Sequence, residues 1–188
     1  MARTPSIMVA LGTKAPGFIL PDTVTGKQIS LDDIKGEAAT MVMFICNHCP
    51  FVKHVNEELV KLANNYKNKG IGFAAISAND AINYPGDAPE KMKETAIQLQ
   101  YPFPYCYDET QEVAKAYGAA CTPDFFIYNG KEELVYRGQL DDSRPGNEIP
   151  VTGSDIRFAL DCLISNQAVP VAQRPSIGCN IKWKENED

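Results

Sequence analysis

The chain has 188 residues, of which 44% are hydrophobic and 22% are charged, and its formal net charge is −6. This balance is typical of one globular domain that can bury a core without disulfide cross-links. The acidic balance and the lack of a basic run argue against nucleic acid and anionic membranes as partners. No stretch is long enough to cross a bilayer and no good secretory signal is present. We therefore expect a reducing, cytoplasmic compartment in which the six cysteines are free.

The first half of the chain predicts a hairpin followed by a parallel crossover unit. Residues 18–20 and 27–31 alternate around Thr25-Gly26, as the two arms of a hairpin do. Residues 40–45 form a continuous apolar run that suits a strand buried on both faces. A helical stripe begins at Pro50, and residues 71–76 form a second buried strand. Strand, helix and strand in this order indicate a parallel pair joined by a helix.

The second half adds helices and an antiparallel hairpin. Asn129-Gly130 between two apolar runs is a strong hairpin signal. We expect one domain with a mixed sheet covered by helices on both faces, its core over about residues 12–165, and an extended tail on its surface over residues 166–188. The further elements are helices over residues 89–99, 109–117 and 154–165, a short strand over 103–107, and hairpin strands over 125–128 and 133–137.

Cys49 is the leading candidate for a reactive residue, in the stretch Cys46-Asn47-His48-Cys49-Pro50. It stands where a buried strand meets a helix N-terminus, and the positive end of the helix dipole favours a thiolate there. A thiolate is the nucleophile in disulfide exchange and in peroxide reduction. We expect its sulfur to be accessible, with His48, Lys53 and His54 as groups that could tune its acidity.

A second candidate element is Cys121-Thr122-Pro123, directly before the strand predicted at residues 125–128. A proline at this place removes a donor from the sheet, which is unusual before a buried strand. A cis bond between Thr122 and Pro123 would expose backbone to a partner chain. We expect this element to lie beside Cys49.

These residues resemble a known family. The stretch over residues 12–22 is similar to the opening of the alkyl-hydroperoxide-reductase/thiol-specific-antioxidant family, and Cys49-Pro50, Thr122-Pro123 and the following hairpin resemble the thioredoxin superfamily. Together with residues 47–52 and 174–183, the chain resembles a peroxiredoxin-like branch. The resemblance implies an α/β thioredoxin-like fold, thiol redox activity and a cis bond before Pro123 packed against the reactive cysteine.

The sequence also departs from these patterns. The peroxiredoxin motif Pro-x-x-x-Thr/Ser-x-x-Cys has Val42 and Cys46 at its first two fixed positions, counted back from Cys49. Pro123 stands where the family carries a peroxide-orienting arginine, and Arg137 lies further along the chain. Without such a donor, fast peroxide reduction is not expected. Against thioredoxin, either Cys46 and Cys49 form the redox pair, or Cys49 is the first member and Val52 takes the place of the second.

Several cysteines could resolve an oxidised Cys49. We rank Cys46 and Cys121 together, followed by Cys179 in the tail, whereas Cys106 and Cys162 are expected to pack inside elements. His48 and His54, with Cys46 and Cys49, offer four soft ligands, but their spacing is unlike that of a zinc site. We therefore expect neither a metal nor another cofactor.

The sequence thus predicts a thiol-based redox enzyme, either a thiol-disulfide oxidoreductase or a peroxiredoxin-like antioxidant. Its partners would be a protein or small-molecule disulfide, or a peroxide, together with a thiol reductant. The alternatives are a non-catalytic redox sensor or adaptor that binds a partner through the face around Pro123, and a small metal-binding protein.

Overall fold

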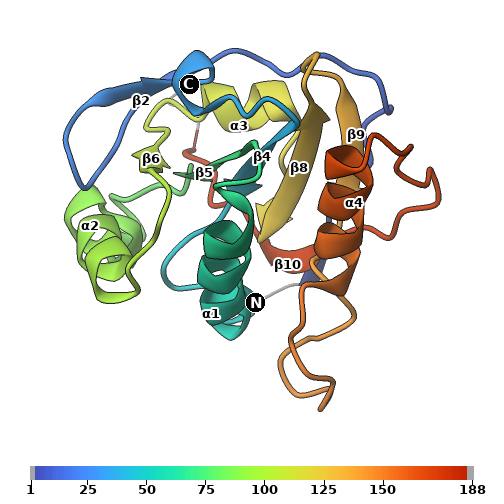
Figure 1. Ribbon diagram of the computed structural model, residues 1–188. Helices are drawn as coiled ribbons and strands as arrows, with labels where there is room; N and C mark the ends of the chain where they lie inside the picture. Colours follow the sequence, from blue (N-terminus) through green and yellow to red (C-terminus); the bar gives the residue numbers. More distant parts are fainter. Residues whose placement is uncertain (1–2, 186–188) are drawn as a thin grey trace.

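A computed structural model describes residues 3–185, and a five-stranded mixed sheet forms the centre of the fold (Figure 1). The strand order is β6-β5-β4-β8-β9, in which β4, β5 and β6 run parallel and β8 runs antiparallel to β4 and β9. Every residue of β4 is buried, as the continuous apolar run predicts. The strands are β4 (Ala39–Phe44), β5 (Ile71–Ser77), β6 (Tyr105–Tyr107), β8 (Asp124–Asn129) and β9 (Leu134–Gly138).

Helices cover both faces of this sheet, as expected. Alternate residues of β4 point to opposite faces, so Met43 packs in one apolar cluster and Val42 in the other. The first cluster contains buried residues of α1, α2 and α4, and the second contains those of α3 and of the N-terminal hairpin. The helices are α1 (Pro50–Tyr66), α2 (Pro89–Gln98), α3 (Glu112–Tyr117) and α4 (Ser154–Ile164), with 3-10 turns η1 (Asp32–Ile34) and η2 (Pro85–Asp87).

The N-terminal hairpin forms as the sequence predicts. Its strands β2 (Ile19–Pro21) and β3 (Gln28–Ser30) pair antiparallel. The buried carboxylate of Asp22 accepts hydrogen bonds from the hydroxyl of Thr25 and the backbone N–H of Tyr105. Asp22 therefore closes the turn and fastens the hairpin to β6.

The C-terminal tail is mostly exposed over residues 166–175, as expected for a surface segment, whereas the segment from Ser176 to Ile181 is largely buried. Its strand β10 (Ile177–Asn180) lies between β1 (Arg3–Pro5) and β7 (Cys121–Thr122) in a second antiparallel sheet. Figure 1 shows β10 at the lower end of β8, beside α1. Residues of the tail pack into both apolar clusters, and this burial holds the tail against the domain.

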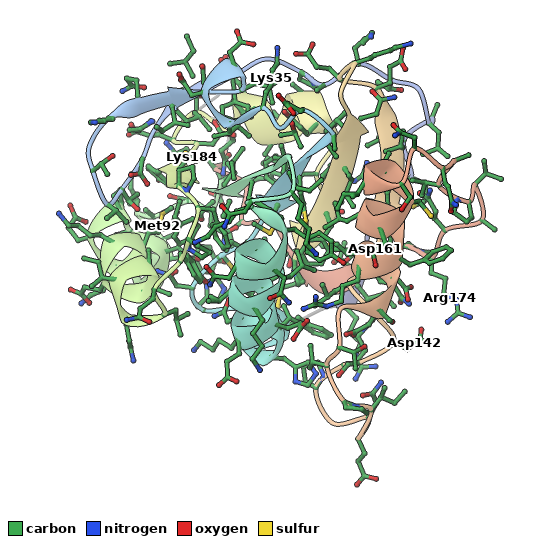
Figure 2. The ribbon with its side chains drawn as sticks, viewed as in Figure 1. Lys35, Met92, Asp142, Asp161, Arg174 and Lys184 are labelled. Atoms are coloured by element: carbon green, nitrogen blue, oxygen red, sulfur yellow. The ribbon has the colours of Figure 1, made fainter. Side chains whose placement is uncertain are left out.

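The tail is fastened on both sides of β10. Before the strand, Arg174 forms an ion pair with Asp142 at 2.6 Å. After it, the backbone N–H of Lys184 donates to the side-chain oxygen of Gln111 at 2.8 Å. Arg174 and Lys184 lie on opposite sides of the molecule in Figure 2. The tail therefore crosses the domain and is held on both sides of β10.

Within residues 3–185, no helix combines the length and apolar character that a membrane span requires.

Candidate active site around Cys49

Cys49 stands at the N-terminus of α1. It is the last residue before the helix, and Pro50 occupies the first helical position, where its missing N–H leaves no partner unsatisfied. Buried residues recur on one face of α1 and fix the helix against the sheet, so the end of β4 and the start of α1 place Cys49 in the core. The helix dipole favours negative charge at this sulfur.

The Thr122–Pro123 peptide bond is cis and lies against both cysteines of the Cys46–Cys49 stretch. Sγ of Cys49 is 3.1 Å from the carbonyl oxygen of Thr122, to which the protonated thiol donates. Sγ of Cys46 is 3.2 Å from the hydroxyl oxygen of Thr122. The structure thus brings together Cys46, Cys49, Thr122 and Pro123, as expected.

Cys179 of β10 directs its sulfur at Cys49. Their sulfur atoms are 2.8 Å apart, while a disulfide needs roughly 2.05 Å, so less than 1 Å of approach separates the pair from a covalent bond. Antiparallel pairing sets Cys179 opposite Thr122 and so aims its sulfur at the site. Cys179, which the sequence ranked after Cys46 and Cys121, thus lies in direct contact with Cys49.

Cys49 is completely buried, with 0% of its surface exposed, which corrects the expectation of an accessible sulfur. The covering element is β10, because Cys179 packs on Cys49 and is itself only 1% exposed. An extended tail beyond the core was expected, but its return over the active cysteine depends on pairing between distant residues that no local pattern encodes.

Hydrogen bonding and burial separate the acidities of the three thiols. The hydrogen bond from Cys46 is the strongest influence on Cys49 and, with those from Cys179 and from backbone N–H groups, lowers its pKa to about 5 against the effect of burial. The same bond to Cys49, together with burial, raises the pKa of Cys46 well above its ordinary value. Burial and then the contact with Cys49 raise the pKa of Cys179 to about 12. At neutral pH the site thus holds one thiolate and two protonated thiols.

The residues expected to tune Cys49 lie elsewhere, apart from His48. Lys53 is exposed on α1, and the ring of His54 contacts the hydroxyl of Ser143 at 2.7 Å. Neither residue is among the groups that influence the pKa of Cys49. His48 is half-buried beside Cys49 and contacts Asp87 instead.

Cys121 is buried on β7 and directs its sulfur to the carbonyl oxygen of Pro123, at 3.6 Å. Burial is the main cause that raises its pKa. Cys106 lies in β6 and Cys162 in α4, both buried, in the elements expected for them.

One group of metal-ligand atoms occurs among the described residues, and it differs from the set considered from the sequence. Cys46, His48 and Asp87 each place one ligand atom within 4.8 Å of the others, whereas His54 contacts Ser143. Three ligands are fewer than the four of a structural zinc site. Both carboxylate oxygens of Asp87 already accept hydrogen bonds. This arrangement is that of a hydrogen-bonded cluster, and we assign no metal to it.

Arg137 does not serve the site. Its guanidinium is completely buried and forms an ion pair with Asp124 at 3.0 Å, with further contacts to the carbonyl of Gly118 and the ring of Phe126. Burial raises the pKa of Asp124 to about 6 in spite of this pair. Asp124 and Phe126 sit on the sheet face opposite Cys49, which explains why Arg137 cannot orient a substrate there.

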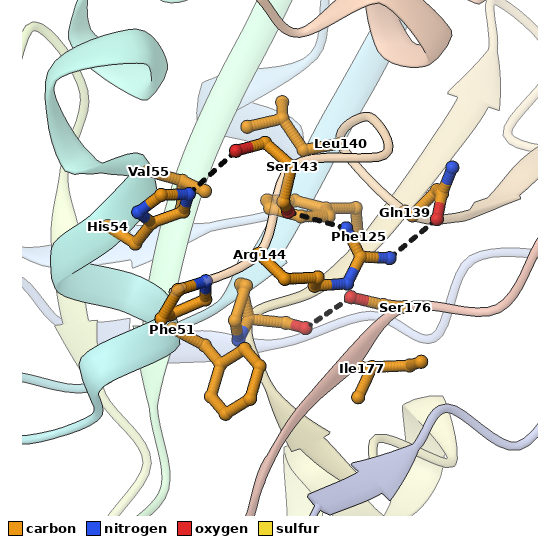
Figure 3. A pocket seen from close by; sticks show the side chains of 12 residues that line it. Phe51, His54, Val55, Phe125, Gln139, Leu140, Ser143, Arg144, Ser176 and Ile177 are labelled. Carbon is orange, nitrogen blue, oxygen red and sulfur yellow. Dashed lines mark hydrogen bonds between the residues drawn. The ribbon is translucent and has the colours of Figure 1, made fainter. Parts of the chain in front are cut away.

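Three residues that the sequence did not reveal support the site. Ser176 donates its hydroxyl to the carbonyl oxygen of Pro123 at 2.6 Å, beside a small pocket between α1, Arg144 and the tail (Figure 3). Gly178 passes so close to Thr122 that a Cβ atom would lie 1.9 Å from its carbonyl oxygen. The third is Asp87. In the sequence, Pro85-Gly86 indicates only a turn, and Asp87 does not stand at a spacing from the cysteines that would predict a contact with them.

Comparison with known proteins finds relatives by sequence. The thiol-disulfide oxidoreductase ResA of Bacillus thuringiensis is 28% identical over 128 residues, which cover 66% of this chain and 67% of that protein. The protein of the same name from Halalkalibacterium halodurans is 26% identical over 125 residues, covering 66% and 65%.

Solved structures give the fold. An uncharacterized conserved protein of Geobacillus kaustophilus is 60% identical with a TM-score of 0.97, covering 99% of this chain and 98% of that one. A hypothetical protein of Sinorhizobium meliloti is 46% identical with a TM-score of 0.95, covering 97% and 100%. The thioredoxin domain of a thiol-disulfide oxidoreductase of Bacteroides vulgatus, at 21% identity and a TM-score of 0.59, covers 69% and 89%. The α/β thioredoxin-like fold expected from the sequence is therefore confirmed.

A family model described as the AhpC/TSA family matches residues 11–137. The matched region contains Cys49 and the cis peptide before Pro123, and it ends before β10. Because the match spans more than half of the chain and includes the cysteine and the cis-proline on which the site is built, this protein belongs to the AhpC/TSA family.

Proposed function

We propose that the protein is a thiol-disulfide oxidoreductase in which Cys49 is the nucleophile and Cys179 the resolving thiol. The observation that carries the proposal is the contact between their sulfur atoms at 2.8 Å, one in a thiolate of pKa about 5 and the other in a protonated thiol. A low-pKa thiol beside a second thiol is the arrangement that disulfide exchange needs. The thiol-disulfide oxidoreductases among the relatives support the same reaction.

The reaction proceeds in two exchanges. The thiolate of Cys49 attacks one sulfur of a protein or small-molecule disulfide, forms a mixed disulfide and releases the other sulfur as a thiolate. That thiolate can take the proton of Cys179, whose sulfur then attacks Cys49. The products are the Cys49–Cys179 disulfide and a fully reduced substrate. An external thiol reductant returns the enzyme to its dithiol form, so we place the protein in a reducing, cytoplasmic compartment.

The complete burial of Cys49 favours peroxide reduction as a second candidate, because a small oxidant reaches an enclosed sulfur more readily than a protein disulfide does. The Cys49 thiolate would cleave the O–O bond, become a sulfenic acid and release an alcohol or water. Cys179 would then condense with the sulfenic acid, forming the same disulfide and a water molecule. One observation argues against peroxide reduction: Arg137 is paired with Asp124 and cannot stabilise the leaving oxygen by hydrogen bonding.

Disulfide mapping tests the proposal directly. The reduced protein is oxidised with one equivalent of a small disulfide or of hydrogen peroxide, and the linked peptides are identified by mass spectrometry. We expect a Cys49–Cys179 link that Cys179→Ser abolishes and that Cys162→Ser, a matched change at a buried cysteine on α4, leaves intact. Insulin reduction and peroxide consumption, measured in parallel, show whether the protein reacts with disulfides or with peroxides.

The alternatives give different results. A Cys46–Cys49 link in the wild-type protein would contradict the assignment of Cys179. A protein that captures a partner equally well after Cys49→Ser and turns over neither oxidant would be a sensor or adaptor and not an enzyme.

A further inference from the structure

Asp87 has the most completely bonded carboxylate near the site, although it is remote from the cysteines in sequence. It is 0% exposed at the end of η2. One oxygen accepts the backbone N–H groups of Asn47 at 2.8 Å and His48 at 3.2 Å. The other accepts Nδ1 of His48 at 2.5 Å and the side-chain amide of Asn79 at 2.7 Å. Four N–H donors converge on one buried carboxylate, and three of them belong to the two residues between Cys46 and Cys49.

These bonds fix the loop that separates the two cysteines. Because a carboxylate only accepts, Nδ1 of His48 must carry its hydrogen, and the ring is further held by stacking on Tyr84 with centroids 5.7 Å apart. Asn79 also accepts the backbone N–H of Lys182 at 2.8 Å, three residues after Cys179. Asp87 therefore lies at the centre of a network that joins the loop, the end of β5 and the tail.

Asp87 also acts on one of the two cysteines by its charge. A carboxylate oxygen of Asp87 and the sulfur of Cys46 lie within 4.8 Å of each other in a buried setting. At this distance a fixed negative charge disfavours a second one. It opposes ionisation of Cys46, and its influence there is one of the causes that raise the pKa of that thiol. For Cys49 the largest influence on the pKa is the hydrogen bond from Cys46, followed by burial.

The other ionisable groups around the pair do not reverse this effect. Burial raises the pKa of Tyr101 and of Tyr105, so both phenols stay neutral where Cys49 ionises. Lys182 is a positive charge, but it acts on Cys179. The ionisable groups around the two thiols are thus Asp87, His48, Tyr101, Tyr105, Cys121 and Cys179.

We propose that Asp87 is a positioning residue that keeps the shared proton on Cys46 and so places the negative charge of the thiol pair on Cys49. The protonated Cys46 then donates to the Cys49 thiolate, and the hydroxyl of Thr122 can donate to Cys46. The inference rests on the proposed function only in taking Cys49 as the nucleophile. The hydrogen bonds of Asp87 come from Asn47, His48 and Asn79, so Asp87 acts on the thiol pair through the loop between the cysteines and through its charge.

The test follows each thiol separately against pH. In cysteine-labelled protein, the NMR shift of the β-carbon reports whether Cys46 or Cys49 is ionised. In the wild type we expect Cys49 to ionise first and Cys46 last. In Asp87→Asn, which keeps the side-chain size and removes the charge, we expect the ionisation of Cys46 to move down by about one to two pH units. Asn79→Ala is the control, because it removes the hydrogen bond to Asp87 and the one from Lys182 but leaves the charge of Asp87.

Each measurement has a result that would overturn the proposed role of Asp87. Wild-type protein in which Cys46 ionises with or before Cys49 overturns the proposal without any variant, so a failure of Asp87→Asn to fold does not protect it. An unchanged Cys46 titration in Asp87→Asn, or an equal shift in Asn79→Ala, also overturns it. Disulfide mapping of Cys49 and Cys179 does not depend on these shifts, so either proposal can fail alone.

Discussion

Replacing Gly178 with alanine should loosen the tail strand over Cys49 and expose its sulfur. A Cβ atom at Gly178 would lie 1.9 Å from the carbonyl oxygen of Thr122 and 2.5 Å from its carbonyl carbon, both backbone atoms next to the cis bond. Contacts below 3.0 Å are essentially never seen for real Cβ atoms, so the strand must retreat by at least 1.1 Å, the difference between 3.0 and 1.9 Å. Cys179 is the next residue and must move with it.

The size of the effect follows from the energy of overpacking. Forcing an extra carbon into a packed site destabilises it by about 1–3 kcal/mol. If a bulky reagent reaches Cys49 only when β10 lifts away, this energy raises the open population and the alkylation rate by about 5- to 150-fold. The formation of the Cys49–Cys179 disulfide should slow at the same time, because its sulfur atoms no longer begin in contact.

The assay is the rate of maleimide labelling of Cys49 at neutral pH, mapped by mass spectrometry. Gly17→Ala is the control, since a Cβ atom there meets nothing within 4 Å. Labelling of Gly178→Ala at the wild-type rate, with disulfide formation undiminished, would refute the idea that β10 closes the site. An equal acceleration in Gly17→Ala would show that the effect is not specific to this strand.

Three further predictions concern acidity and stability. The alkylation rate of Cys49 should be nearly constant at neutral and alkaline pH and fall to half near pH 5. Cys46→Ala should move this midpoint to higher pH, because it removes the hydrogen bond that stabilises the thiolate. A wild-type midpoint at about 8.5, the ordinary pKa of a thiol, would contradict the assigned hydrogen bonding. Asp124→Ala leaves Arg137 buried without its partner and should lower the free energy of unfolding in urea by about 3–5 kcal/mol, whereas a loss well below about 1 kcal/mol would mean that water replaces the carboxylate. Cys162→Ser should leave the rate of Cys49 labelling unchanged, and an altered rate would place that thiol in the site.

The sequence by itself determined the elements and the position of Cys49. Hydrophobic periodicity and turn residues are local signals, so β4, α1, β5 and the hairpin of β8 and β9 could be predicted with small errors at their ends. The junction that places Cys49 at the start of α1 is equally local, because it depends on a buried run followed by a proline.

Only the tertiary structure decided which groups surround Cys49. Cys179 is 130 residues away in the chain, and nothing in the spacing of six cysteines favours it over Cys121, which lies nearer in sequence and faces another carbonyl. Asp87 reaches the site from the 3-10 turn η2 after β5, where the sequence indicates only a turn. Strand pairing and burial of the tail depend on complementary surfaces that form once the chain is folded. For this reason the position of Cys49 beside Cys46 and the Thr122–Pro123 peptide could be expected from the sequence, but its burial and its contact with Cys179 could not.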